Sequence, residues 1–258
     1  MSDALIRRMK RQIIKAAHSA GEGHVPSAYS VLDLIWVLYN RVMRIDPKHP
    51  NDLTMDRFIL SKGHASLALY SVLTEKGYFP QEYFNTFCKY DAPMAGHPDC
   101  NKVPGVEAST GSLGHGLPMA VGIAMGSKIR RITNRIFCLV GDGECNEGTI
   151  WEAALLAAHH KLSNLCCIID YNHSTDRALQ MGDLAAKFKS FGWEAITIDG
   201  HNHDEIYRAL SYIHNNKPLV VIAETIKGKG VKCMENEPAW HHRAPNNEEL
   251  KAILEELL

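Results

Sequence analysis

Four short apolar runs alternate with helical stretches in the second half of the chain, and this alternation restricts the possible folds more than any other feature. The runs "RIFCLV", "NLCCIID", "EAITID" and "LVVIAET" begin at residues 135, 164, 194 and 219. Helical periodicity separates them over residues 148–160, 183–191 and 204–215. Buried strands that alternate with helices predict a parallel sheet covered on both faces. We therefore expect an α/β fold with a doubly wound, mainly parallel sheet.

The first half of the chain is mostly helical. Helices are expected over residues 2–20, 30–43, 65–77 and 113–129, with a short buried strand starting at Arg57. Ser30 and Asp33 have the spacing of a capping box, which predicts a helix start at Ser30. Residues 90–110 have little periodicity, and loops of that length are usually functional. Since no linker interrupts the pattern, residues 1–258 are predicted to form a single domain.

Composition excludes several classes of function. The 28 basic residues balance 29 acidic ones, so no general attraction to nucleic acid or anionic membranes is expected. No apolar run reaches the roughly 20 residues of a membrane span. Cys138, Cys166 and Cys167 lie in strand-like runs, and the seven cysteines include no CxxC pair. Reduced thiols in the core of a cytoplasmic protein are the expected state.

Polar side chains follow two consecutive strands of the predicted sheet. Gly141, Asp142 and Gly143 end the first of them, and Asn172 follows the second. A βαβ unit would bring both loops to the same edge of the sheet, where ligands bind. Carboxylate and amide oxygens suit Mg²⁺ or Ca²⁺, with diphosphate oxygens completing the shell. Two tight turns are the competing interpretation, but the asparagine after the next strand favours a metal site.

The paired aspartate and asparagine resemble the signature of thiamine diphosphate enzymes. Other segments resemble the diphosphate-binding part of the transketolase family, in the same order and spacing from about residue 6 to residue 250. These segments are "GEGHVPSAYSVLDLIWVLY", "DRFILSKGHASLALYSVL", "AGHPD", "GVEASTGSLGHG" and "GDGECNEGTIWEAA". The resemblance implies a thiamine-diphosphate-binding fold and the N-terminal subunit of a split transketolase. Such an enzyme transfers a two-carbon ketol unit from a ketose phosphate to an aldose phosphate.

The resemblance also implies the cofactors and the residues that bind them. Thiamine diphosphate and Mg²⁺ (or Ca²⁺) are the expected cofactors. Asp142, Asn172 and the backbone carbonyl of Ser174 would hold the metal. The residues expected to contact the cofactor are Gly111, Ser112 and Leu113 near the aminopyrimidine, Gly141 and Gly143 at the diphosphate, and also His64, Asp142, Glu147, Asn172 and His241.

Four histidines match family contexts, and histidine is suited to a reversible proton transfer near neutral pH. The resemblance assigns His24 to the hydroxyl of the cleaved bond and His97 to the ketol group. It places His64 near the diphosphate. In "AWHHRAP" the fourth position falls on His241, with His242 as the alternative. A histidine that only stabilises a turn is the competing interpretation at each position.

The chain departs from the family pattern in two loops, and it matches only the first of three transketolase domains. Ser112 and His115 replace the commoner Pro and Gln, and Asp176 falls one position early. In the family, the equivalent of Glu147 pairs with the catalytic glutamate of the partner's pyrimidine-binding domain. We therefore expect activity only with a separate chain that carries the pyrimidine-binding and C-terminal domains, in a two-plus-two heterotetramer.

Two alternatives to a split transketolase remain open. One is a non-catalytic, regulatory subunit that binds the cofactor without turnover. The other is half of another thiamine diphosphate enzyme, either a deoxyxylulose-phosphate synthase or the alpha subunit of a 2-oxo-acid dehydrogenase. The retained histidines His24, His64 and His97 favour the transketolase over the regulatory subunit and the dehydrogenase, and the segment "GVEASTGSLGHG" favours it over the synthase.

Overall fold

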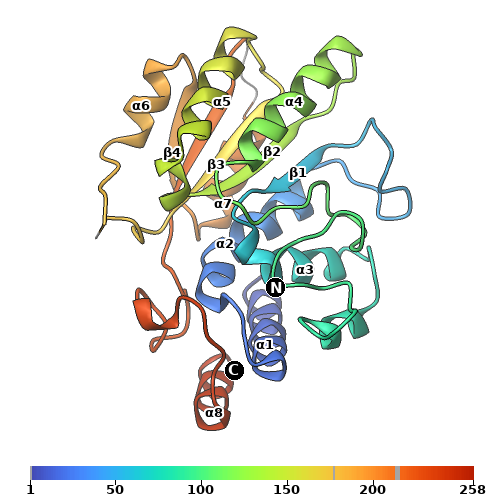
Figure 1. Cartoon of the computed structure of the whole chain (residues 1–258), viewed down its shortest axis with the longest axis vertical. Coiled ribbons are helices and arrows are strands. Elements are labelled where there is room, and N and C mark those ends of the chain that lie inside the picture. Colours follow the sequence, from blue (N-terminus) through green and yellow to red (C-terminus); the bar gives the residue numbers. More distant parts are fainter. Residues whose placement is uncertain (1, 177, 213–215) are drawn as a thin grey trace.

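Figure 1 shows the computed structural model of the chain, which describes residues 2–176, 178–212 and 216–258. A five-stranded sheet with the strand order β1-β2-β3-β5-β4 lies at its centre, and every neighbouring pair of strands is parallel. The strands are β1 (Arg57–Leu60), β2 (Ile136–Gly141), β3 (Leu165–Tyr171), β4 (Glu194–Asp199) and β5 (Leu219–Glu224). The predicted parallel sheet is confirmed.

Helices cover both faces of this sheet (Figure 1). One face packs against α4 (Gly116–Ile129), α5 (Gly148–His159) and α6 (Leu184–Ser190). The other face packs against α1 (Ser2–Ala20), α2 (Val25–Val37), α3 (Ser66–Glu75) and α7 (His203–Ser211), and α8 (Asn247–Glu256) lies beside α1. Short helical turns span Leu38–Val42, Gly63–Ala65, Gln81–Thr86, Gly143–Asn146 and Pro238–Trp240.

The strands are apolar without interruption because successive side chains enter different cores. In β2, Phe137 and Leu139 belong to the core under α1, α2 and α3. Cys138 and Val140 belong to the core under α4 and α5. A strand buried on both faces has no solvent-facing position for polar residues. All seven cysteines are free thiols, and the three expected in strands are buried.

The predicted start of the second helix was wrong. Helix α2 begins at Val25, with Pro26 in its first turn, where a missing N–H costs nothing. Ser30 is buried inside the helix and donates to the Ser27 carbonyl at 3.1 Å and to Asp170 at 2.8 Å. Local sequence does not distinguish this buried mid-helix hydroxyl from a helix cap, because its carboxylate partner, Asp170, is distant in the chain.

Other predicted boundaries also shift by one or a few residues. Helix α4 starts at Gly116 rather than at residue 113, because the preceding residues form a turn. Helix α7 ends at Ser211, whereas the prediction reached residue 215. Residues 213–215 lie outside the described residues. Within the part of the chain that the structure describes, no helix is long and apolar enough to cross a membrane.

Candidate functional site

The candidate site lies at the carboxyl edge of the sheet, where β2 and β3 end side by side. Gly141 is in register with Asp170, and the Asp142 N–H donates to the Asp170 carbonyl at 3.1 Å. Asp142 and Asn172 therefore leave neighbouring strands at the same edge. The sequence prediction placed these two residues on adjacent strand ends, and the structure does so.

The Asp142 carboxylate has one oxygen without a partner. Asp142 is 3% exposed, and its Oδ1 accepts the Gly143 N–H at 2.8 Å. Its Oδ2 is buried and has no hydrogen-bond partner among the described residues. Burial, followed by the charge of Asp170, raises the pKa of Asp142. Because an unpaired buried carboxylate oxygen is costly, this geometry fits a bound cation.

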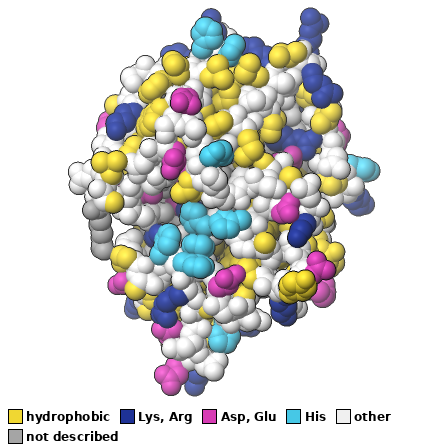
Figure 2. Space-filling view, viewed as in Figure 1, with side chains coloured by type: hydrophobic (Ala, Val, Ile, Leu, Met, Phe, Trp, Pro, Cys, Tyr) yellow, Lys and Arg dark blue, Asp and Glu magenta, His cyan; other side chains and the backbone are white. Residues whose placement is uncertain are grey.

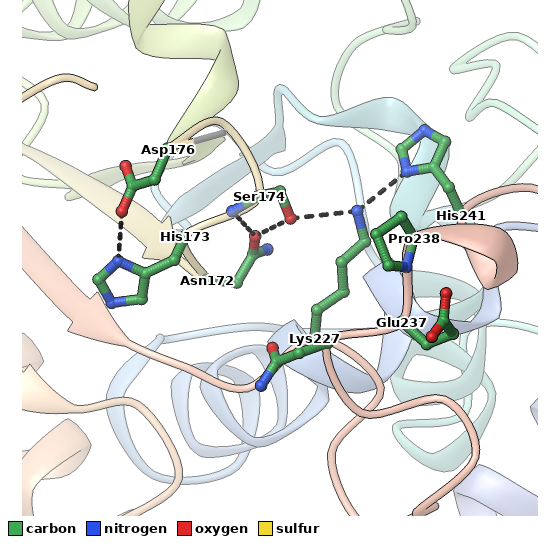
Figure 3. Close-up of a pocket in the computed structure, with 9 residues that line it drawn as sticks. Asn172, His173, Ser174, Asp176, Lys227, Glu237, Pro238 and His241 are labelled. Atoms are coloured by element: carbon green, nitrogen blue, oxygen red, sulfur yellow. Dashed lines mark hydrogen bonds and ion pairs between the residues drawn. The ribbon is translucent and has the colours of Figure 1, made fainter. Parts of the chain in front are cut away.

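Asn172 is held by both ends of its amide. Its Nδ2 donates to Asp170 Oδ2 at 2.8 Å. Its Oδ1 accepts the Ser174 N–H at 3.1 Å and the Ser174 hydroxyl (Figure 3). The described residues contain no group of three or more His, Cys, Asp or Glu that could hold a metal. Asp142, the Asn172 oxygen and a backbone carbonyl are the groups here that could hold a cation.

A buried ion pair behind Asn172 was missed by the sequence reasoning. Asp170 is fully buried and accepts hydrogen bonds from Lys62 Nζ, Thr225 Oγ1 and Ser30 Oγ. Burial acts to raise the pKa of Asp170, but the Lys62 charge and the hydrogen bonds outweigh it and lower that pKa. The only local signal was a carboxylate inside an apolar strand, together with a lysine in "LSKGH". Asp170 thereby orients the Asn172 amide.

The rings of His24, His64, His97, His241 and His242 form one cluster, and Figure 2 shows histidine side chains gathered on one face of the molecule. The ring centroid of His24 lies 5.1 Å from that of His64, 6.3 Å from that of His97 and 5.3 Å from that of His241. The His242 ring stacks on His24 at 4.3 Å. The structure therefore brings together all three histidines expected from the first half of the chain. Both candidates for the fourth position join them.

The surroundings of His24, His64 and His241 disfavour the protonated forms of these three rings. Burial, followed by the neighbouring histidines, lowers the pKa of His24 from its usual 6.5 to about 3. Burial and then Lys62 lower the pKa of His64 to about 2, and burial and then Lys227 lower the pKa of His241. Neutral imidazoles at pH 7 offer a ring nitrogen that accepts a proton.

Distant segments position the first three histidines. His24 immediately precedes α2, and His64 lies in the turn after β1. A Cβ at Gly63 would lie 2.8 Å from the Thr110 backbone, so only glycine allows the two loops to approach so closely. In the irregular segment at residues 90–110, the Tyr70 hydroxyl donates to the His97 carbonyl at 3.2 Å. This hydrogen bond fixes the backbone at His97.

A cavity of about 460 Å³ lies beside the predicted metal ligands (Figure 3). Lys227 Nζ lies 3.1 Å from Ser174 Oγ and 2.9 Å from His241 Nδ1. An ammonium group at this position suits an anionic ligand. Lys227 was also missed, although "ETIKGKG" directly follows a strand. The cavity is lined by Asn172, His173, Ser174, Asp176, Lys227, Asn236, Glu237, Pro238 and His241.

The glycine-rich loop before α4 is tied to both neighbouring strands. Glu144 is 1% exposed and accepts the Gly114 N–H at 2.8 Å, the Gly141 N–H at 3.1 Å and the Ser61 hydroxyl. Burial raises the pKa of Glu144. A Cβ at Gly111 would lie 3.0 Å from the His97 ring. The loop that carries the three predicted aminopyrimidine contacts, Gly111, Ser112 and Leu113, therefore lies against the histidine cluster.

Glu147 lies next to Gly114 of this loop, since a Cβ at Gly114 would come within 2.7 Å of the Glu147 Cβ. It is exposed, immediately precedes α5 and does not cap that helix with its side chain. His115 is also exposed, and its Nδ1 lies 3.0 Å from the Leu113 carbonyl. Both side chains are therefore accessible to a molecule bound at this edge.

Comparison with known proteins identifies the family. A family model described as "Transketolase, thiamine diphosphate binding domain" matches residues 2–257. The chain belongs to the transketolase family. Its fold is that family's thiamine-diphosphate-binding fold, because it superimposes on the Campylobacter jejuni transketolase structure with a TM-score of 0.91 and 32% identity over 100% of this chain.

Two similar proteins from this family are named as parts of transketolases. One, from Actinobacillus succinogenes, is a subunit of apulose-4-phosphate transketolase and is 40% identical, over 96% of this chain and 92% of that protein. The 6-deoxy-6-sulfo-D-fructose transketolase subunit SqwG from a Clostridium species is 38% identical, over 92% of this chain and 89% of that protein. By contrast, this chain covers only 43% of the C. jejuni transketolase chain.

Proposed function

We propose that this protein is the N-terminal subunit of a split transketolase. With a second chain, it would transfer a two-carbon ketol unit from a ketose phosphate to an aldose phosphate. Support comes from relatives of nearly equal length that are named transketolase subunits. The convergence of His24, His64, His97 and His241 beside the Asp142 loop is the single observation that carries the proposal.

Thiamine diphosphate and Mg²⁺ (or Ca²⁺) are the proposed cofactors. When bound, thiamine diphosphate supplies the carbanion chemistry that breaks and forms the bond next to the ketose carbonyl. Asp142, Asn172 and the Ser174 carbonyl would hold the metal, and the unpaired Asp142 Oδ2 supports that assignment. Lys227 and His241 line the adjacent cavity, where they would face the diphosphate.

The other predicted residues receive roles from their places around the site. His24 would exchange a proton with the sugar hydroxyl at the cleaved bond, because its neutral ring is a ready acceptor. His97 would hydrogen-bond the ketol group, and His64 would lie near the diphosphate. The segment Gly111, Ser112 and Leu113 would contact the aminopyrimidine, with Gly141 and Gly143 approaching the diphosphate through the backbone.

A separate partner subunit is proposed to complete the active site. It would carry the pyrimidine-binding and C-terminal domains, in a two-plus-two assembly. The exposed position of Glu147 beside the glycine-rich loop suits a contact with that subunit. We also propose a cytoplasmic location, which agrees with seven free cysteines.

Reconstitution tests this function. The chain is mixed with the product of the adjacent gene, thiamine diphosphate and Mg²⁺. Ketol transfer to an aldose phosphate is then measured with xylulose 5-phosphate, apulose 4-phosphate or 6-deoxy-6-sulfofructose as the donor. We expect transfer from at least one of these sugars by the mixture and from none by either chain alone. Cofactor binding without transfer from any of them would instead support the non-catalytic regulatory subunit.

A further inference from the structure

The loop that follows β5 brings Lys227 into the site cavity of about 460 Å³, and its backbone is held at three points. The N–H groups of Thr225 and Gly228 donate to backbone carbonyls at 3.1 and 3.0 Å. Between them, the Ile226 N–H donates to a side chain, the Nε2 atom of His201, at 3.0 Å. Because Ile226 directly precedes Lys227, this hydrogen bond restrains the backbone from which the lysine side chain extends.

His201 reaches this loop because the turn after β4 lies directly against the end of β5. The Gly200 N–H donates to the Glu224 carbonyl at 2.8 Å. A Cβ at Gly200 would lie 2.4 Å from Thr225 Cγ2, so a larger residue would push the two turns apart. The His201 side chain is 10% exposed, and a hydrogen bond in such a buried place is stronger than one at a wet surface.

Asp33 of α2 fixes the tautomer of the His201 ring. A backbone N–H can only donate, so the Nε2 atom that accepts it carries no proton. The proton of the neutral ring is on Nδ1, which donates to Asp33 Oδ2 at 2.9 Å. His203 Nε2 donates to the other oxygen, Asp33 Oδ1, at 2.8 Å. Burial acts to raise the pKa of Asp33, but the hydrogen bonds from His201 and His203 outweigh it and lower that pKa to about 2.

We propose that His201 and Asp33 are positioning residues for Lys227. The Asp33 carboxylate holds His201 in the tautomer that accepts the Ile226 N–H. That hydrogen bond fixes the loop so that the Lys227 ammonium lies in the cavity, 2.9 Å from His241 Nδ1. Neither positioning residue lines this cavity, so both act through the backbone. The inference rests on the proposed function, which places the cofactor diphosphate beside Lys227.

The test measures the Kd for thiamine diphosphate by calorimetry, in the complete complex with the partner subunit and Mg²⁺. His201→Phe keeps a flat ring but cannot accept the Ile226 N–H. The freed loop must then be ordered when the cofactor binds, so the Kd should rise roughly three- to tenfold. His201→Gln, which keeps an acceptor, should recover most of this loss. His203→Phe is the matched control, because it removes a hydrogen bond to Asp33 and leaves the Ile226 N–H bonded; its Kd should equal that of the wild type.

A double-variant cycle tests whether the effect passes through Lys227. Lys227→Met should itself raise the Kd, because it removes the ammonium group from the cavity. Adding His201→Phe to Lys227→Met should then raise the Kd little further, since the side chain that His201 positions is already gone. Fully additive effects would show that His201 acts on the cofactor by another route, and would overturn the inference.

The other outcomes separate this inference from the proposed function. Equal Kd values in wild type and His201→Phe, or an equal rise in His203→Phe, would overturn the positioning role while wild-type ketol transfer remains. Cofactor binding without transfer would overturn the function alone, since the comparison of Kd values needs no turnover. A wild-type complex that does not bind thiamine diphosphate would overturn both. If the phenyl ring prevents assembly, His201→Ala and His203→Ala make the same comparison.

Discussion

Replacement of Asp142 should weaken cofactor binding without lowering the stability of the folded chain. In Asp142→Asn, the buried carboxylate with the raised pKa becomes a neutral amide of the same shape. Because the folded chain without ligands disfavours the charged form, the variant should unfold at an equal or higher denaturant concentration. Its affinity for thiamine diphosphate with Mg²⁺ should fall at least tenfold, as measured by calorimetry of the complex. A variant that loses stability and keeps its affinity would contradict this assignment.

The histidine cluster predicts a loss of stability in mild acid. The pKa of His64 is about 2 in the folded chain, whereas its usual value is 6.5. As the pH falls, the unfolded chain therefore binds a proton at His64 before the folded chain does. The free energy of unfolding should therefore decrease as the pH falls below about 6.5, and the loss should continue towards the folded pKa. In His64→Gln, denaturant midpoints should depend less on pH between 6.5 and 4. An unchanged slope would show that other groups cause the acid sensitivity.

Single residues differ in how readily sequence reveals them. Asp142 and Asn172 could be predicted to lie together because each follows a strand of the predicted sheet, whereas His24 was expected at the site from the resemblance of its segment to the transketolase family. Lys62 and Asp170 could not be predicted as site residues, because neither stands in a recognisable motif. They pair only in the fold, since they are 108 positions apart in the sequence. Their pairing depends on strand order, which local patterns leave undetermined.

At the scale of elements, the Lys62–Asp170 pair joins the ends of β1 and β3, with Ser30 of α2 and Thr225 after β5. Replacing one member leaves a buried charge without its partner, at a cost of about 3–5 kcal/mol. We expect Asp170→Asn to lower the free energy of unfolding by about that amount. The double variant Lys62→Met with Asp170→Asn should regain much of the loss.

Chemical denaturation monitored by circular dichroism measures both variants. Asp204→Asn is the matched control, because it removes the exposed ion pair with Arg41, which should contribute less than about 1 kcal/mol. If Asp170→Asn lowered the free energy of unfolding no more than this control does, the Lys62–Asp170 pair would not hold the strands together.

Elements were predicted well where periodicity was strong, and less well at their ends. All five strands, and helices such as α1 and α5, match the alternation in the sequence. The predicted start of α2 was wrong because the Ser30 hydroxyl bonds the distant Asp170 instead of capping a helix. The path of the irregular segment at residues 90–110 could not be predicted, since hydrogen bonds from α3 determine it.

At the scale of the whole molecule, Glu147 is exposed in this chain by itself, which suits a contact with a second subunit. We expect light scattering of the reconstituted complex to give the mass of two copies of this 28.8 kDa chain and two copies of the partner. Glu147→Gln should lower ketol transfer while leaving that mass unchanged. A one-plus-one complex with full activity would contradict the proposed assembly.

The strand pairing also determines when this site forms during synthesis. Arg57 pairs with Ile136, so β1 has no strand to pair with until the ribosome has made β2. By that time His24, His64 and His97 have already been made. At translation rates of about 5–20 residues per second, the wait from β1 to β2 is on the order of ten seconds. During that time the apolar β1 segment has no neighbouring strand. During this interval the newly made chain exposes an unpaired apolar strand that can aggregate, and chaperones protect it where the stability of the finished fold cannot.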